Sequence, residues 1–278
     1  LCPPEGDAGT GMVATNSIRE RTGNVSAGTS VFAMLVLEKK ITKVHPEIDI
    51  VVTPEGKQVG MAHSNNCTSD YDAWIQLFRQ VSEALGHPVD TGTLYDVLLN
   101  AALAGDSDAG GLLHYSFISG EHVMDLTAGR PLFVRSPDDP FTIGNFMRSL
   151  LFTALCALRT GLDVLTEDEG VKVDEIRGHG GFFKTAGVGQ RIMAAATKIP
   201  VSIPESAGEG GAWGIALLAA YMHLAAGEQR LADFIDSITE GSISAPVHPD
   251  PEDVAGFNSY LARYHAQIGI EREAVARG

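Results

Sequence analysis

Three closely spaced glycines, Gly178, Gly180 and Gly181, form the stretch of this sequence that is best suited to hold an anion. They follow a short strand-like segment and precede a helix-like run over residues 186–198. Glycine leaves backbone N–H groups uncovered, and the N-terminus of a helix favours negative charge. The pattern predicts a phosphate-binding turn, although glycine turns also pack helices against strands where no ligand binds.

A second glycine-rich turn follows further along the chain. Residues 200–204 are predicted to form a strand, and the stretch 205–214 contains Gly208, Gly210 and Gly211. These glycines precede a long apolar helix that we expect to end near Ala226. Strand, glycine turn and helix, repeated twice, are typical of an α/β nucleotide-binding domain.

Asp7 and the tripeptide Gly28-Thr29-Ser30 are the other candidates for chemistry. Asp7 follows Gly6 at the start of a short predicted helix, where a carboxylate can cap the free N–H groups. The tripeptide joins two apolar segments, 24–27 and 31–37, into a predicted hairpin whose hydroxyls and amides point outward. Such a turn also occurs in hairpins that bind nothing.

The composition excludes several classes of protein. The chain has 278 residues, 44% of them hydrophobic, which is enough to fill a core. Its formal net charge of −15 argues against nucleic acid or an anionic membrane surface as a partner. Its apolar run 215–222 is too short to cross a bilayer. The three cysteines lie far apart, as expected for a cytoplasmic protein without disulfides.

Several catalytic signatures are missing from the sequence. The nine histidines show no His-Glu-x-x-His or Cys-x-x-Cys spacing, so no protein-ligated metal site is predicted. There is no Gly-x-x-x-x-Gly-Lys-Ser/Thr loop and no Gly-x-Ser-x-Gly elbow. Because the chain has a net charge of −15, an anionic ligand would have to be held locally, by backbone amides or by a metal.

The rest of the chain is predicted to supply the elements that position these turns. We expect a hairpin over 48–63, helices that begin near residues 70, 93, 141 and 230, a buried strand over 110–118, and a final helix over 252–276 that packs on the outside.

The order of the motifs resembles the second, nucleotide-binding half of the FGGY carbohydrate kinases, most closely their xylulokinase and ribulokinase branch. Gly6-Asp7, the hairpin turn, Ser119-Gly120-Glu121, Gly178-His179-Gly180-Gly181 and residues 205–214 follow in that order along nearly the whole chain. The resemblance implies an α/β, ribonuclease H-like (actin-like ATPase) domain with a mixed sheet flanked by helices. It also implies that residues 1–18 end a preceding sugar-binding domain and that residues 19–278 form the C-terminal nucleotide-binding domain.

The resemblance also assigns roles to single residues. By this resemblance, Asp7 stands at the position of the family's catalytic base. A carboxylate held there can deprotonate a sugar hydroxyl. The sequence departs from the family pattern at His179 and in the loop 65–70, where relatives often carry glycine or alanine. The positions implied to contact the nucleotide are Gly28, Thr29, Ser30, Gly178, Gly180, Gly181, Gly210 and Gly211.

The activity that the resemblance implies is transfer of the γ-phosphoryl group of ATP to a ketopentose, xylulose first and ribulose second. Mg²⁺ would be bound mainly through the nucleotide phosphates. The chain starts at Leu1 without Met, so we expect it to be a piece of a longer enzyme and to be inactive without the preceding domain. We expect the complete enzyme to be a homodimer. A non-catalytic actin-like ATPase and a regulatory sugar-binding relative are the alternatives. Asp7 ahead of the hairpin turn favours the kinase.

Overall fold

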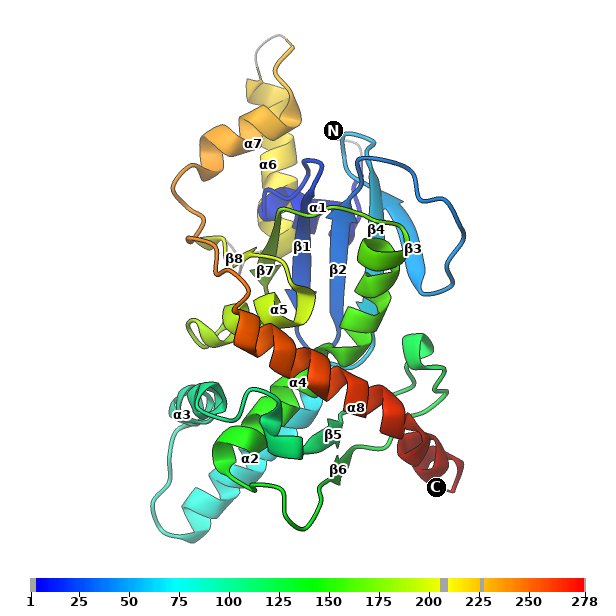
Figure 1. Ribbon diagram of the computed structural model, residues 1–278. Helices are drawn as coiled ribbons and strands as arrows, with labels where there is room; N and C mark the ends of the chain where they lie inside the picture. Colours follow the sequence, from blue (N-terminus) through cyan, green and yellow to red (C-terminus); the bar gives the residue numbers. More distant parts are fainter. Residues whose placement is uncertain (1–3, 206–209, 226–227, 278) are drawn as a thin grey trace.

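A six-stranded mixed sheet forms the centre of the computed structural model, which describes residues 4–205, 210–225 and 228–277 (Figure 1). The strand order is β3-β4-β2-β1-β7-β8; β1 pairs with β7 and β7 with β8 in parallel, and the other pairs are antiparallel. The strands are β1 (Thr22–Ala27), β2 (Val31–Val36), β3 (Ile48–Val52), β4 (Gln58–Ser64), β7 (Glu175–His179) and β8 (Val201–Ser202). The predicted mixed sheet and both predicted hairpins are confirmed.

Helices cover both faces of this sheet, because successive strand side chains point to opposite faces. Met34 and Val36 of β2 pack with α1 (Asp7–Ala14), α6 (Gly210–Leu224) and α7 (Leu231–Thr239). Ala33 and Leu35 belong to the larger core on the other face, with α4 (Ile143–Asp163) and α5 (Val188–Thr197).

The helix α4 is the main core helix. With the π-helical turn that continues it (Val164–Asp168), it is long and apolar enough to cross a membrane. However, 78% of its most apolar window is buried inside the protein. Its side chains contact the strands β2, β4 and β5 and the helices around it, so the apolar surface is explained by the core.

A second group of elements lies at the end of the sheet opposite to α6 and α7 (Figure 1). It contains α2 (Ser69–Ala84), α3 (Thr91–Leu103), and a two-stranded sheet of β5 (Leu113–Tyr115) and β6 (Leu132–Val134). The predicted strand over 110–118 is wrong in length. Gly110 and Gly111 adopt φ values of 60° and 82°, so they form a short turn (Ala109–Gly111) instead of extended backbone.

The last helix, α8 (Pro251–Ala276), packs on the outside as predicted, with one face exposed and the other face buried against the core. Phe257, Tyr260 and Tyr264 are at most 1% exposed. Gly256 allows this approach, because a Cβ atom there would lie 2.0 Å from the backbone oxygen of Ser107.

Candidate functional site

Two of the predicted glycine turns lie side by side at one end of the sheet, the edge formed by the carboxyl ends of β1 and β7. The parallel register pairs Val25 of β1 with Gly178 of β7, so both strands end at the same edge. Gly180 has φ 101°, and a Cβ atom there would lie 2.4 Å from the backbone oxygen of Ala27. The turn after β7 is thus in backbone contact with the strand that leads into Gly28.

Both turns also face open space. A Cβ atom built on Gly28 or on Gly181 would meet no atom within 4 Å. The hairpin turn is closed by a hydrogen bond from Gly28 N to Ser30 O of 2.9 Å. The two turns therefore present bare backbone to a ligand at this edge of the sheet.

The glycines after β7 do not open the next helix, which corrects the prediction for residues 186–198. A 3-10 turn (Gly181–Phe183) comes first, and α5 begins at Val188 after Gly187. The reason is that Phe182 and Phe183 are buried and draw the chain into the core. The uncovered N–H groups of α5 are thus not those of the glycine turn.

The loop 65–68 is a third part of the site, and it supports the hairpin. The N–H groups of Cys67 and Thr68 donate to the backbone oxygens of Thr29 and Gly28, both at 2.9 Å. The Cys67 thiol is buried, which raises its pKa and keeps it protonated. The predicted departure of this loop from the family pattern therefore falls directly beside the hairpin turn.

A buried carboxylate holds this loop in place. Oε2 of Glu121 accepts hydrogen bonds from Ser64 Oγ at 2.8 Å, from Asn65 N at 2.9 Å and from Asn66 Nδ2 at 3.1 Å. Asn66 Oδ1 in turn accepts from Ser119 N at 3.0 Å. The motif Ser119-Gly120-Glu121 therefore acts on the hairpin through the loop.

A cavity of about 430 Å³ opens beside Gly181, between α2 and α3. Asp72 lines it and accepts from Thr68 Oγ1 at 2.9 Å and from Tyr95 OH at 2.6 Å. Burial, followed by the bond to Asp72, raises the pKa of Tyr95, so the phenol remains a donor. Lys184 also lines the cavity. These side chains are not among the residues predicted from the sequence, although Thr91, Tyr95 and Leu99 have the spacing of one helix face.

His179 lies at the end of β7, beside Ser26 of β1. Burial lowers the pKa of its imidazole, so the ring is neutral at neutral pH. Its Nε2 atom is buried and has no hydrogen-bond partner in the described part of the chain.

Asp7 is the first residue of α1 and is exposed. Its Oδ1 atom accepts from Ala8 N at 2.8 Å, which satisfies one free N–H group of the helix. Among the residues that the structure describes, no hydrogen bond or ion pair joins Asp7 to the hairpin turn or to Gly180 and Gly181.

Gly210 and Gly211 begin α6, whereas Gly208 lies outside the described residues. A Cβ atom on Gly211 would lie 3.1 Å from Thr10 Oγ1, and one on Gly214 would lie 1.9 Å from Thr10 O. The start of α6 is thus packed on α1. The predicted site residues fall into two groups: those around the hairpin and Gly181, and those at the α1–α6 contact.

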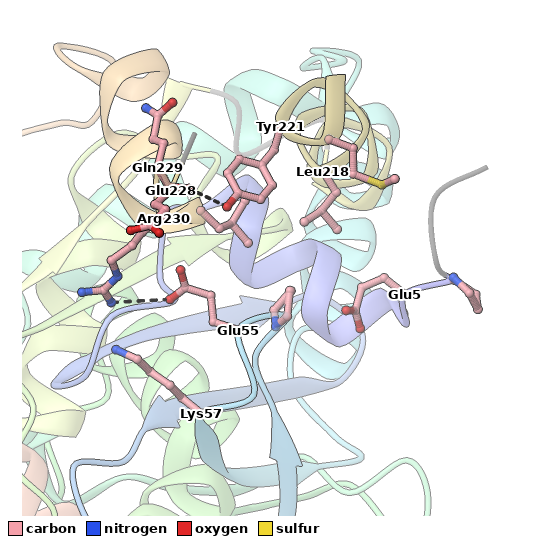
Figure 2. Close-up of a pocket in the computed structure, with 12 residues that line it drawn as sticks. Glu5, Glu55, Lys57, Leu218, Tyr221, Glu228, Gln229 and Arg230 are labelled. Carbon is pink, nitrogen blue, oxygen red and sulfur yellow. Dashed lines mark hydrogen bonds and ion pairs between the residues drawn. The ribbon is translucent and has the colours of Figure 1, made fainter. Parts of the chain in front are cut away.

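A larger cavity, about 800 Å³, lies near the start of the described chain (Figure 2). It is bordered by Glu5, by the β3–β4 turn and by α6, and none of the predicted site residues lines it. Glu55 forms an ion pair with Arg230 at 3.8 Å, and Tyr221 OH donates to Gln229 O at 2.6 Å. The cavity is separate from the glycine turns.

Comparison with known proteins identifies the family. Residues 23–223 match the model of the FGGY family of carbohydrate kinases, C-terminal domain. The chain belongs to the FGGY family of carbohydrate kinases. Xylulose kinase of Haemophilus influenzae is 24% identical over 259 residues, which cover 93% of this chain and 49% of that protein. The FGGY chain thus spans about half the length of this curated relative.

Solved structures show the same fold. A xylulose kinase from Rhodospirillum rubrum superposes with a TM-score of 0.75 at 17% identity, covering 96% of this chain and 50% of that one. A glycerol kinase with ADP from Plasmodium falciparum gives a TM-score of 0.73 at 14% identity, with 94% and 50% covered. The predicted family and the actin-like fold are confirmed.

Proposed function

We propose that this FGGY domain is the nucleotide-binding half of an ATP-dependent sugar kinase whose acceptor is a ketopentose, xylulose first and ribulose second. The observation that carries the proposal is the cavity beside Gly181, which opens next to a second bare-backbone turn at Gly28. The curated relative and several structural neighbours, which are named xylulose kinases, support the choice of sugar.

In this proposal the nucleoside occupies the cavity between α2 and α3, and the phosphates extend toward Gly28, Thr29 and Ser30. The backbone N–H groups and hydroxyls of that turn stabilise charge on the transferred phosphoryl group. Gly178 contributes indirectly: a Cβ atom there would lie 2.5 Å from the Phe183 ring, so glycine keeps the Gly180–Gly181 turn in place.

Mg²⁺ fits this arrangement as an ion held by the nucleotide. The described residues contain no group of three or more His, Cys, Asp or Glu side chains that could ligate a metal. The phosphate oxygens would then supply most of the ligands, and the ion would neutralise charge on them.

Asp7 is proposed as the general base that accepts the proton of the sugar hydroxyl. Residues 1–18 would end the preceding sugar-binding domain, and residues 19–278 would form the nucleotide-binding domain. That preceding domain would supply the sugar pocket and bring the sugar to Asp7 and the γ-phosphate. We also propose that the complete enzyme is a cytoplasmic homodimer.

The test is calorimetry with ADP on the 278-residue chain. Gly181→Val should weaken binding by roughly 10²-fold, about 2.7 kcal/mol, because the side chain fills space beside the cavity. The control is Gly269→Val on the exposed face of α8, where a Cβ atom also meets nothing within 4 Å. Equal ADP affinity in the two variants would place the nucleotide elsewhere.

A further inference from the structure

The helix α2 separates the proposed nucleotide cavity from a second, smaller cavity. Tyr71 and Asp72 line the first. Asp70, Trp74 and Leu77, which have the i, i+4, i+7 spacing of one helix face, line the second, with a volume of about 240 Å³. The strand β6 closes its other wall through Leu132 and Phe133.

His114 lines this second cavity, and one nitrogen of its ring is a buried acceptor without a donor. His114 is 1% exposed, and its Nδ1 atom lies 2.7 Å from Ser149 Oγ. The Ser149 hydroxyl gives its proton to Phe146 O, at 2.7 Å, so Nδ1 must carry a proton and donate it. Nε2 is therefore an unprotonated acceptor, and it has no partner among the described residues.

The second polar group is a carboxylate. Asp70 is 5% exposed and has no ion pair with any cation of the described chain. Burial raises its pKa to about 6, and a hydrogen bond from the Trp74 side chain opposes this shift. The carboxylate is thus mostly ionised at neutral pH; the N-terminus of α2 and Trp74 compensate part of its charge, and no cationic side chain of the described residues pairs with it.

The apolar walls of the cavity are aromatic. The rings of His114 and Phe133 are stacked, with centroids 4.6 Å apart, and Trp74 lies edge-on to His114 at 6.2 Å. A ligand that pairs with the Asp70 carboxylate must bring hydrogen-bond donors. A positive charge on it is favoured by the carboxylate and by the aromatic faces.

We propose that this cavity binds a small organic ammonium ion. Its ammonium group donates to the Asp70 carboxylate, and its apolar part lies between Trp74 and Phe133. The volume suits a ligand of the size of benzylamine, which is the probe for the test.

The experiment uses the whole chain without nucleotide, so its outcome is independent of the proposed kinase function. The chain has two tryptophans, and Trp213→Phe leaves Trp74 as the only one, which is excited selectively at wavelengths that tyrosine does not absorb. Benzylamine should change Trp74 emission saturably, whereas benzoate, which has the same shape and the opposite charge, should not.

Two variants test the assignment of the residues. Asp70→Asn should weaken benzylamine binding by at least about tenfold through loss of the charged acceptor. Ala73→Leu, at an exposed position on the rim, should block entry without disturbing the core. Asp49→Asn, on the exposed face of β3, is the charge-matched control and should bind normally. Binding that is equal for benzylamine and benzyl alcohol, or unchanged in both test variants, overturns the proposal.

Discussion

Replacement of Gly180 by alanine tests the contact that brings the two glycine turns together. Gly180 has φ 101° and ψ −178°, a region that only glycine adopts without strain. The added methyl group would also lie 2.4 Å from the backbone oxygen of Ala27 and 3.1 Å from its nitrogen. These are backbone atoms of β1, so no side-chain rotation relieves the clash.

The expected loss of stability follows from these two effects. The backbone conformation costs about 1–3 kcal/mol, and overpacking against fixed atoms costs about 1–3 kcal/mol. At about 2–4 °C per kcal/mol for a domain of similar size, the melting temperature should fall by at least about 4 °C. Urea unfolding followed by circular dichroism measures the same difference as a lower midpoint with an unchanged slope.

The adjacent glycine supplies the matched control. Gly181→Ala places its methyl group in open space, so the free energy of unfolding should change by less than about 1 kcal/mol. If Gly180→Ala and Gly181→Ala unfold at the same urea concentration, the turn is not clamped against β1. The placement of the hairpin beside the turn after β7 would then be wrong.

In the complete enzyme, Asp7→Asn should lower turnover by roughly 10²-fold or more with ADP affinity unchanged, as steady-state kinetics and calorimetry can show; near-normal turnover would leave Asp7 as a helix cap. Glu121→Gln should loosen the loop that supports the hairpin, so the Cys67 amide should exchange its hydrogen faster; unchanged exchange would exclude this role. The hydrogen bond from His45 lowers the pKa of Glu169 from its usual 4.5 to about 2. That stabilisation is present above about pH 4.5 and is lost as the pH falls toward 2, so urea midpoints of wild type and Glu169→Gln should converge over this range; a constant gap contradicts it. The isolated chain should release no ADP from ATP in a coupled assay with xylulose or ribulose, and sugar-dependent release would place the sugar pocket within these residues.

Features that depend on neighbouring residues could be predicted from the sequence. The hairpin around Gly28-Thr29-Ser30 was predicted because apolar strands on both sides of a small-residue turn pair with one another. The position of Gly180 at the carboxyl end of the sheet could be predicted because β7 ends one residue before it, at His179. Both are local patterns, and the structure confirms the elements that carry them.

Features that depend on contacts between residues far apart in the sequence could not be predicted. Asp72 and Tyr95 come from different helices, and only the packing of α2 against α3 brings them to Gly181. The start of α5 was misplaced because burial of Phe183 under Gly178 extends the turn. The role of Glu121 was missed because its partners lie more than fifty residues away.

The contact of Gly214 with Thr10 has a mechanical consequence. A side chain between two helices keeps their backbones apart and lets the helices slide. Here the Cα atom of Gly214 in α6 meets the carbonyl group of Thr10 in α1 directly. Lengthwise sliding of α6 along α1 would drive these backbones into each other. The two helices also contact one another at Gly211 and along their lengths, so we expect them to move as one unit when the start of α1 is displaced.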